Sequence, residues 1–411
     1  MAIVKPFRCI RPKREAAPSV AALPYDVYNR KEACEAVRNN RLSFLRIDRA
    51  ETQFSDDVDM YADCVYEKAR ELLDRMIGEG TFLEDEGEAY YLYELVMDGR
   101  SQTGIVACCA VDDYLNGVIK KHENTREEKE LDRIRHVDVT NAHTGPIFLT
   151  YRSEAALKAL VEKTKEEEAL YDFVADDGVT HRVWKAPAEL TAKIEAAFAG
   201  IPYTYIADGH HRAASAVKVG LKRRQENPGY TGEEPFNYFL SVLFPSDELM
   251  IMPYNRVVRD LNGMDADEFL AQVEQKFQVR RVEGQAYEPQ EKGCFGMYLG
   301  GNWYELKATE EIKSQDPVRG LDVSILQEHL LGPILGIGDP RTDSRIDFVG
   351  GIRGLEELEN RCLNDMRVAF SMYPTSIEEL LAVADAGLLM PPKSTWFEPK
   401  LRSGLFIHRL S

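Results

Sequence analysis

The sequence lacks an apolar run long enough to cross a membrane, and it lacks an apolar signal region at its N-terminus. Cysteine is scarce: the 411 residues include 7 cysteines, and no two of them form a CxxC pair. Disulfide frameworks belong to small secreted chains, so we expect these thiols to be buried and reduced. Together these absences predict a cytoplasmic protein without a membrane partner.

An excess of positive charge is also missing. The chain has 51 Lys and Arg against 69 Asp and Glu, which gives a formal net charge of −18. An acidic chain without a basic stripe repels the phosphate backbone over most of its surface, so nucleic acid is not an expected partner. The hydrophobic share of 44% and the charged share of 29% are ordinary for a globular protein with two or three domains.

No long Ser/Gly linker, fixed-period repeat or low-complexity segment divides the chain. Predicted hairpins and helices alternate too irregularly for a doubly wound parallel sheet, so we predict an α/β fold with mixed sheets and helices, α+β-like in character. The predicted domains are an N-terminal α/β region at 1–115, a core at 116–260 and a C-terminal α/β region at 261–411. Three finer predictions are an extended arm ending in a strand at 42–47, a hairpin of 239–244 with 249–252, and helices at 58–78 and 188–199.

The most informative motif is IADGHHR at 206–212. Alternating β-formers precede it and no helix breaker follows until Gly220, so it is predicted to be a strand-to-helix turn. Free N–H groups, a helix dipole, a flexible Gly209 and the side chain of Arg212 suit a phosphate. A carboxylate at Asp208 beside an anion points to Mg²⁺-assisted phosphoryl transfer, with Asp208 on the metal.

Two other interpretations of this heptad stay open. Asp and Gly are common in caps and tight turns, so DGHHR is also compatible with capping and solvation alone. A zinc site is the weaker alternative, because adjacent histidines lack the spacing of three or four residues that lets imidazoles converge on one metal.

The segment KKHENTREEKELDR at 120–133 predicts a solvated helix capped by Asn124 or Thr125. His122 and Glu123 precede this cap and follow a short apolar stretch, so they are expected in a second strand-to-helix loop. Two such loops can meet at one end of a sheet. Taken alone, a His-Glu pair before a helix faces solvent more often than it catalyses.

The chain ends with MPPKSTWFEPKLRSGL at 390–405, where three prolines prevent a regular helix. Its donors and cations fit either a phosphate-facing tail or a surface loop held by aromatic residues. These candidate groups are Lys393, Ser394, Thr395 and Lys400. A Walker A motif is excluded, since no glycine-rich loop precedes the lysine.

These three motifs, with LPYDVYNR at 23–30, resemble the prokaryotic family called domain of unknown function 1015 over nearly the whole chain. That family resembles in turn the ParB/sulfiredoxin superfamily, which includes free-serine kinases. The resemblance implies a ParB/sulfiredoxin-like core with added N-terminal and C-terminal regions. His210 stands where sulfiredoxins carry their reactive cysteine, which argues against sulfiredoxin activity.

The resemblance also implies roles for single residues. Glu123 is implied as the general base and Asp208 as a Mg²⁺-binding or substrate-activating acid. The implied contacts to the nucleotide are Gly209, His210, His211, Arg212, His122, Thr125, Lys393, Ser394, Thr395 and Lys400.

The expected function is a phosphotransferase that uses ATP or ADP with Mg²⁺ on a small hydroxyl metabolite, for which free L-serine is the implied substrate. One alternative is a nucleotide-binding regulator that is non-catalytic or hydrolyses slowly. Another is an interaction scaffold in which DGHHR is structural.

Overall fold

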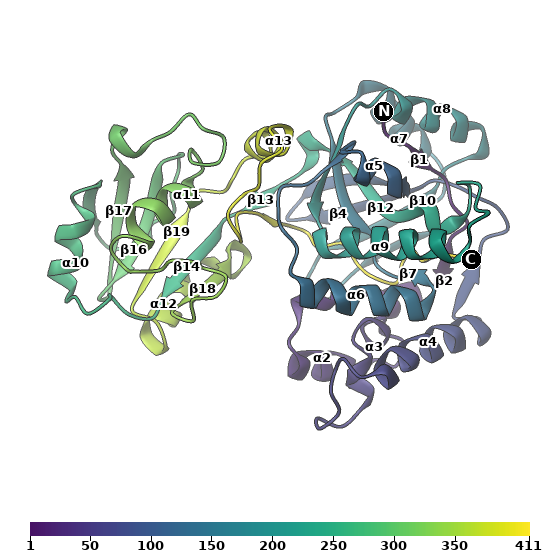
Figure 1. Ribbon diagram of the computed structural model, residues 1–411, viewed down its shortest axis with the longest axis horizontal. Helices are drawn as coiled ribbons and strands as arrows, with labels where there is room; N and C mark the ends of the chain where they lie inside the picture. The colour runs from purple at the N-terminus through teal and green to yellow at the C-terminus, as the bar shows by residue number, and fades with distance from the viewer. The chain divides into compact units, whose positions relative to one another are not determined.

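The computed structural model describes all 411 residues, which divide into two compact units (Figure 1). Unit 1 consists of Met1–Leu249 and Pro399–Ser411. Unit 2 is the intervening segment Met250–Glu398. The last residues of the chain therefore belong to the same unit as its beginning.

A mixed nine-stranded sheet forms the centre of unit 1. Parallel pairs lie among antiparallel neighbours, which confirms the predicted α/β class with mixed sheets. In spatial order the strands are β6 (Ile119–Lys120), β11 (Thr204–Asp208), β8 (Ile147–Tyr151), β12 (Tyr238–Pro245), β5 (Arg100–Ala110), β4 (Tyr91–Met97), β10 (Thr180–Lys185) and β9 (Tyr171–Val174), and β1 (Val4–Lys5) pairs with β5.

Helices α7 (Ala155–Thr164) and α8 (Ala188–Ala199) pack against each other, and α9 (His210–Glu226) packs on α6 (Glu127–Thr140) and on α5 (Val111–Leu115) (Figure 1). Apolar side chains from α7, α8 and α9 join those of the sheet in one core. Gly220 does not end α9. A Cβ there would lie 2.7 Å from the carbonyl oxygen of Phe236, so glycine allows a close approach between the helix and the following chain.

The N-terminal part of unit 1 is largely helical and has a core of its own. Its elements are α1 (Ala17–Val20), the 3₁₀ turns η1 (Tyr25–Val27) and η2 (Ala50–Gln53), α2 (Arg30–Val37), α3 (Leu45–Asp48), α4 (Asp63–Gly78) and the paired strands β2 (Ile10–Pro12) and β3 (Phe82–Glu84). The predicted strand at 42–47 is wrong. Phe44, Leu45 and Ile47 are all buried, because the segment turns as a short helix inside this core and is not half-exposed in a sheet.

Two other local predictions are also wrong. β13 (Ile251–Met252) pairs with β20 (Trp396–Phe397) and not with β12, so no hairpin joins 239–244 to 249–252. Neither Asn124 nor Thr125 caps α6: Arg126 holds the N-cap position without a side-chain bond, and the Thr125 hydroxyl donates to Glu130 Oε2 at 2.7 Å. The cysteines are free, as expected, and four of them are buried, but Cys64 is exposed.

Unit 2 has a six-stranded sheet in which every pair is antiparallel. Its order is β15 (Phe277–Val282), β17 (Asn302–Ala308), β16 (Cys294–Leu299), β19 (Val368–Met372), β14 (Tyr254–Val258) and β18 (Ile346–Gly350). Its helices are α10 (Ala266–Val273), α11 (Asp322–Leu326) with the π turn η6 (Gln327–Leu331), α12 (Gly354–Asn364) and α13 (Ile377–Asp385). Helix α12 packs on β19 and β16 over an apolar core.

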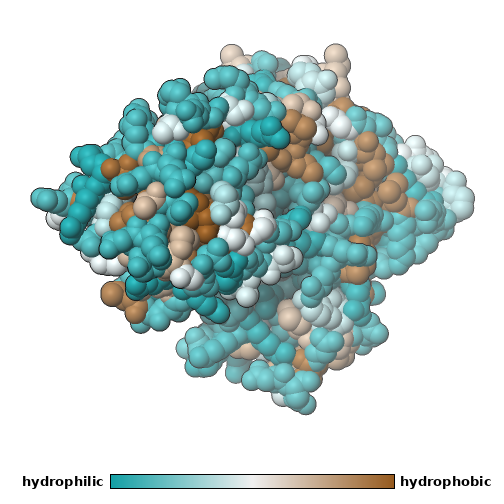
Figure 2. Space-filling model, turned by 60° about the vertical axis from the view of Figure 1, so that its left-hand side comes forward, coloured by the Kyte–Doolittle hydropathy of each residue, from teal (hydrophilic) through white to brown (hydrophobic).

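Hydrophilic residues cover most of the surface that Figure 2 shows. None of the helices combines the length and the apolar character needed to cross a bilayer.

Candidate functional site

Residues 206–212 form the strand-to-helix turn that the sequence predicts. Strand β11 ends at Asp208, Gly209 follows with a φ of 90°, and α9 begins at His210. A Cβ on Gly209 would lie 3.0 Å from Nε of Arg212. Glycine is therefore favoured twice, by the left-handed backbone and by the guanidinium that lies close to it.

The first turn of α9 leaves backbone donors available. The N–H groups of His210, His211 and Arg212 have no acceptor in the protein, and no side chain caps the helix. Gly209 N–H, in contrast, donates to Asp208 Oδ1 at 2.8 Å. Unpaired N–H groups and the positive end of a 17-residue helix are suited to an anion such as phosphate.

The loop that carries His122 and Glu123 lies beside this turn. Strand β6 runs parallel to β11, so both strands deliver their following loops to the same edge of the sheet. The rings of His122 and His210 meet edge to face with centroids 4.5 Å apart. Nδ1 of His210 lies 3.8 Å from Oε2 of Glu123. The structure thus brings the two predicted loops together.

Burial keeps both of these histidines neutral near pH 7. It lowers the pKa of His122 to about 4 and holds the pKa of His210 well below its usual value. Both ring nitrogens of His122 and Nε2 of His210 are buried without a hydrogen-bond partner. The carboxylate of Glu123 therefore lies beside the neutral imidazole of His210.

Asp208 forms an ion pair with the C-terminal tail. Its Oδ2 lies 3.2 Å from Nζ of Lys400, which is 192 residues away in the sequence. Burial raises the pKa of Asp208, but Lys400 and Arg212 outweigh this effect and hold the pKa well below its usual range. Asp208 is therefore ionised, and Lys400 supplies the positive charge beside it.

Both carboxylate oxygens of Asp208 already have partners, and its role on Mg²⁺ stays a prediction. One carboxylate oxygen accepts from Gly209 N–H and the other is paired with Lys400. No cluster of three or more His, Cys, Asp or Glu side chains is arranged to hold a metal ion. A Mg²⁺ ion needs oxygen ligands, so it would bind this carboxylate only if the ammonium group of Lys400 moved away.

His211 and Arg212 both contact protein atoms. Nε2 of His211 accepts the N–H of Arg126 at 3.0 Å, which satisfies a donor at the start of α6. Burial lowers the pKa of His211, which keeps this nitrogen free to accept. Nη1 of Arg212 donates to the carbonyl of Pro146 at 2.8 Å. These two side chains join the turn to α6 and to the loop before β8.

Three residues of the predicted nucleotide set belong to unit 2. Lys393 has a positive φ of 59°, and its carbonyl accepts from the buried guanidinium of Arg256 at 3.0 Å. The Ser394 hydroxyl donates to Pro391 O at 2.6 Å, and Thr395 follows it before β20. Their role towards a nucleotide stays a prediction.

Two adjacent cavities in unit 1 were not predicted from the sequence. The larger, of about 100 Å³, lies among η1, α3, η2, α4 and α6. The smaller, of about 30 Å³, reaches Arg212 of the turn. Both are lined by Tyr25, Asp48, Arg133 and His136. The smaller cavity has about the volume of one water molecule, and it is lined by His143, whose two ring nitrogens are buried without a partner.

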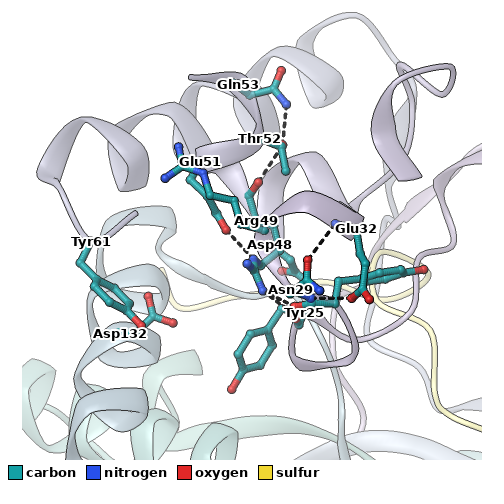
Figure 3. Close-up of polar contacts among 12 residues, drawn as sticks. Tyr25, Asn29, Glu32, Asp48, Arg49, Glu51, Thr52, Gln53, Tyr61 and Asp132 are labelled. Carbon is teal, nitrogen blue, oxygen red and sulfur yellow. Dashed lines mark hydrogen bonds and ion pairs between the residues drawn. The ribbon is translucent and has the colours of Figure 1, made fainter. Parts of the chain in front are cut away.

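Buried ion pairs and backbone contacts shape the larger cavity (Figure 3). Arg49 Nε lies 2.5 Å from Glu51 Oε1, and Arg49 Nη1 donates to the carbonyls of Tyr25 and Tyr28. The ring of Tyr61 lies beside Asp132 at the other side of this view. The only sequence signal was the cluster of charges at 48–51, which follows a segment misinterpreted as a strand.

A protein family whose description is "Protein of unknown function (DUF1015)" matches residues 4–324. No curated protein matches this chain at a significant level. Among solved structures, the chain is similar to a free serine kinase variant in complex with ADP, at 13% identity and a TM-score of 0.37, covering 74% of this chain and 92% of that one. The chain is also similar to SbnI with a C-terminal truncation from Staphylococcus aureus, at 13% identity and a TM-score of 0.41, covering 74% of this chain and 87% of that one. A conserved hypothetical protein from Pyrococcus furiosus is similar at 13% identity and a TM-score of 0.36, covering 74% of this chain and 95% of that one.

Proposed function

We propose that this chain, which belongs to the family of proteins of unknown function DUF1015, is a nucleotide-dependent phosphotransferase acting on a small hydroxyl metabolite. One observation carries the proposal: the open N-terminus of α9 lies beside the carboxylate of Glu123. An anion site and a proton acceptor at the same sheet edge are the two parts that phosphoryl transfer requires. The resemblance stated above supports ATP or ADP as the donor and free L-serine as the acceptor.

In this proposal the N–H groups of His210, His211 and Arg212 bind phosphate oxygens. Glu123 takes the proton of the acceptor hydroxyl, whose oxygen forms a bond to the terminal phosphorus. The bond from that phosphorus to the bridging oxygen breaks, and the shortened nucleotide leaves with the electron pair. Lys400 neutralises charge that develops on the phosphate.

The remaining candidates keep proposed roles as well. His122 and Thr125, in the loop of Glu123, are proposed as further nucleotide contacts. A role of Lys393, Ser394 and Thr395 towards a nucleotide stays a prediction, because these residues belong to unit 2. A Mg²⁺ ion would arrive bound to the nucleotide phosphates and is treated as part of the substrate.

The test is phosphoryl transfer from labelled ATP and ADP, with Mg²⁺, to a panel of free amino acids and small alcohols. Glu123→Gln should retain nucleotide affinity and lose at least about a hundredfold in transfer rate, since general bases contribute roughly 10² to 10⁴. Glu128→Gln is the matched control, because Glu128 is an exposed carboxylate on the neighbouring α6. Equal transfer by both variants, or no nucleotide binding by the wild type, would refute the proposal.

A second candidate is a nucleotide-binding regulator that hydrolyses slowly or not at all. The observation in its favour is that Asp208 and His211 are already engaged, by Lys400 and by Arg126 N–H. In this arrangement the turn would bind an anion, but neither Asp208 nor His211 would take part in phosphoryl transfer. Saturable nucleotide binding with no transfer to any acceptor would favour the regulator over the kinase.

A further inference from the structure

The larger cavity of unit 1 is polar and closely matched in size to a small metabolite. Its volume is about 100 Å³. A cavity of about 150 Å³ holds benzene, which has six non-hydrogen atoms, so this one suits a molecule of about four non-hydrogen atoms and is too small for a nucleotide. Its occupant is therefore a different ligand from the one proposed for the DGHHR turn.

Most charges around the cavity cancel in pairs. Arg49 is paired with Glu51 at 2.5 Å, and both side chains are less than a tenth exposed. Arg133 Nη2 is paired with Asp132 Oδ2 at 2.8 Å. These four groups leave no unmatched charge. Asp26 and Lys129 also line the cavity, are exposed to solvent and carry one charge of each sign.

Asp48 is the exception. It is 5% exposed and lines the cavity, and no lysine or arginine forms an ion pair with its carboxylate. Its Oδ1 accepts from the Thr144 hydroxyl at 2.9 Å. His136 lies beside it, with Nε2 4.0 Å away. Arg133 Nη1 donates to the backbone carbonyl of Asp48 at 3.5 Å, but the carboxylate paired with this guanidinium is that of Asp132.

His136 does not neutralise this carboxylate near pH 7. Its Nε2 lies 3.1 Å from the carbonyl oxygen of Ile47, which requires the imidazole proton at that nitrogen. Burial, together with the charge of Arg133, lowers the pKa of His136, so the ring is neutral. A buried carboxylate without an ion-pair partner of its own is unfavourable, and a cationic ligand would compensate it.

Aromatic rings form much of the remaining wall. Tyr25, Tyr28, Tyr61 and Tyr66 all line the cavity. The rings of Tyr25 and Tyr66 already lie against arginines, at 4.0 Å and 4.4 Å from the guanidinium carbons of Arg133 and Arg135. Tyr28 and Tyr61 line the cavity as well, and a tyrosine ring attracts a cation that lies over its face.

We propose that this cavity binds a small amine whose ammonium group pairs with the carboxylate of Asp48. This is a second ligand site in unit 1, and it goes beyond the proposed function because it needs no phosphate at the turn. The two cavities share Asp48 as a lining residue, and the smaller one reaches Arg212, so a bound amine would lie next to the DGHHR turn.

The test is calorimetric titration of the full-length protein with primary amines of about four non-hydrogen atoms, beginning with ethanolamine, and with uncharged diols of equal size. Saturable binding of an amine without binding of the matching diol is expected. Asp48→Asn should weaken it by about tenfold to about a hundredfold, the effect of losing one charged hydrogen bond. Asp113→Asn is the matched control, since Asp113 is also 5% exposed and accepts from a single neutral donor, the Ile3 N–H.

The proposal is overturned if no amine in the series binds, if diols bind as tightly, or if Asp48→Asn and Asp113→Asn have equal effects. Should Asp48→Asn fail to fold, a crystal structure of the wild type with ethanolamine decides the matter. Its nitrogen should lie within about 3.2 Å of a carboxylate oxygen of Asp48, and a position elsewhere would overturn the proposal. Nucleotide titration of the same samples reports separately on the turn.

Discussion

Replacing Gly209 by alanine tests the geometry on which the candidate site depends. A non-glycine residue in the left-handed region costs about 1 to 2 kcal/mol. The added Cβ would also meet the Arg212 guanidinium at 3.0–3.3 Å, so that flexible side chain must move. We therefore expect Gly209→Ala to lower the free energy of unfolding by about 1 to 3 kcal/mol, measured by urea denaturation.

Gly78→Ala is the matched control within the same unit. Gly78 is the last residue of α4, its φ is not positive, and a Cβ there would have open space around it. Alanine is favoured over glycine in a helix, so this change should stabilise by about 0.5 to 1 kcal/mol. The same substitution, glycine to alanine, is thus expected to lower the free energy of unfolding at position 209 and to raise it at position 78.

Nucleotide binding provides the functional half of this experiment. If the turn shifts to relieve strain, the N–H groups of the first turn of α9 no longer converge, and affinity for ATP or ADP should fall at least about tenfold. An unchanged stability of Gly209→Ala would refute the inferred backbone conformation. A destabilised variant that binds nucleotide as well as Gly78→Ala does would show that the turn is not the anion site.

Two further outcomes are expected. The pKa of Asp208 is lower in the folded protein than its value of about 3.9 in the unfolded chain, so the ionised carboxylate stabilises the fold. This stabilisation is fully present above the unfolded pKa and is lost as the pH falls through the lower folded pKa. The difference in unfolding free energy between wild type and Asp208→Asn should therefore be large near pH 7 and small below about pH 4. A gap that widens in acid would contradict the ion pair with Lys400. Asn29→Ala removes a complete capping box with Glu32 and should lower the free energy of unfolding of unit 1 by about 1 kcal/mol in urea denaturation. Asp265→Ala removes the same kind of capping box in unit 2 and should shift only the unfolding transition of unit 2.

The turn was predictable from sequence because its signals are local. The strand is specified by the β-forming residues before Asp208, the turn by the flexible Gly209, and the helix by the helix-forming residues that follow. All of these signals lie within a few residues of one another. The meeting of this turn with Glu123 was also foreseen, since each follows a strand, and the parallel pair β6–β11 brings them to one edge. The ion pair of Asp208 with Lys400 was not foreseen, because the two residues are 192 positions apart and no local pattern links them.

The segment at 42–51 shows why the second site was missed. Apolar residues at 42, 44, 45 and 47 fit a short strand and a short helix equally well, and such runs cannot be assigned by periodicity alone. The wrong assignment moved Asp48 out of any expected site. Its burial beside Thr144 and His136 depends on packing between distant segments, which composition does not reveal.

The C-terminal tail completes the candidate site from the far end of the chain. Residues 399–411 belong to unit 1, where Lys400 pairs with Asp208 and Arg402 pairs with Asp177. Ser403 lines the smaller cavity, and a Cβ on Gly145 would lie 2.9 Å from its hydroxyl oxygen. Of the two positive charges that act on Asp208, that of Lys400 is therefore supplied only when the two segments of unit 1 are folded together. The 149 residues of unit 2 lie between these two segments in the sequence.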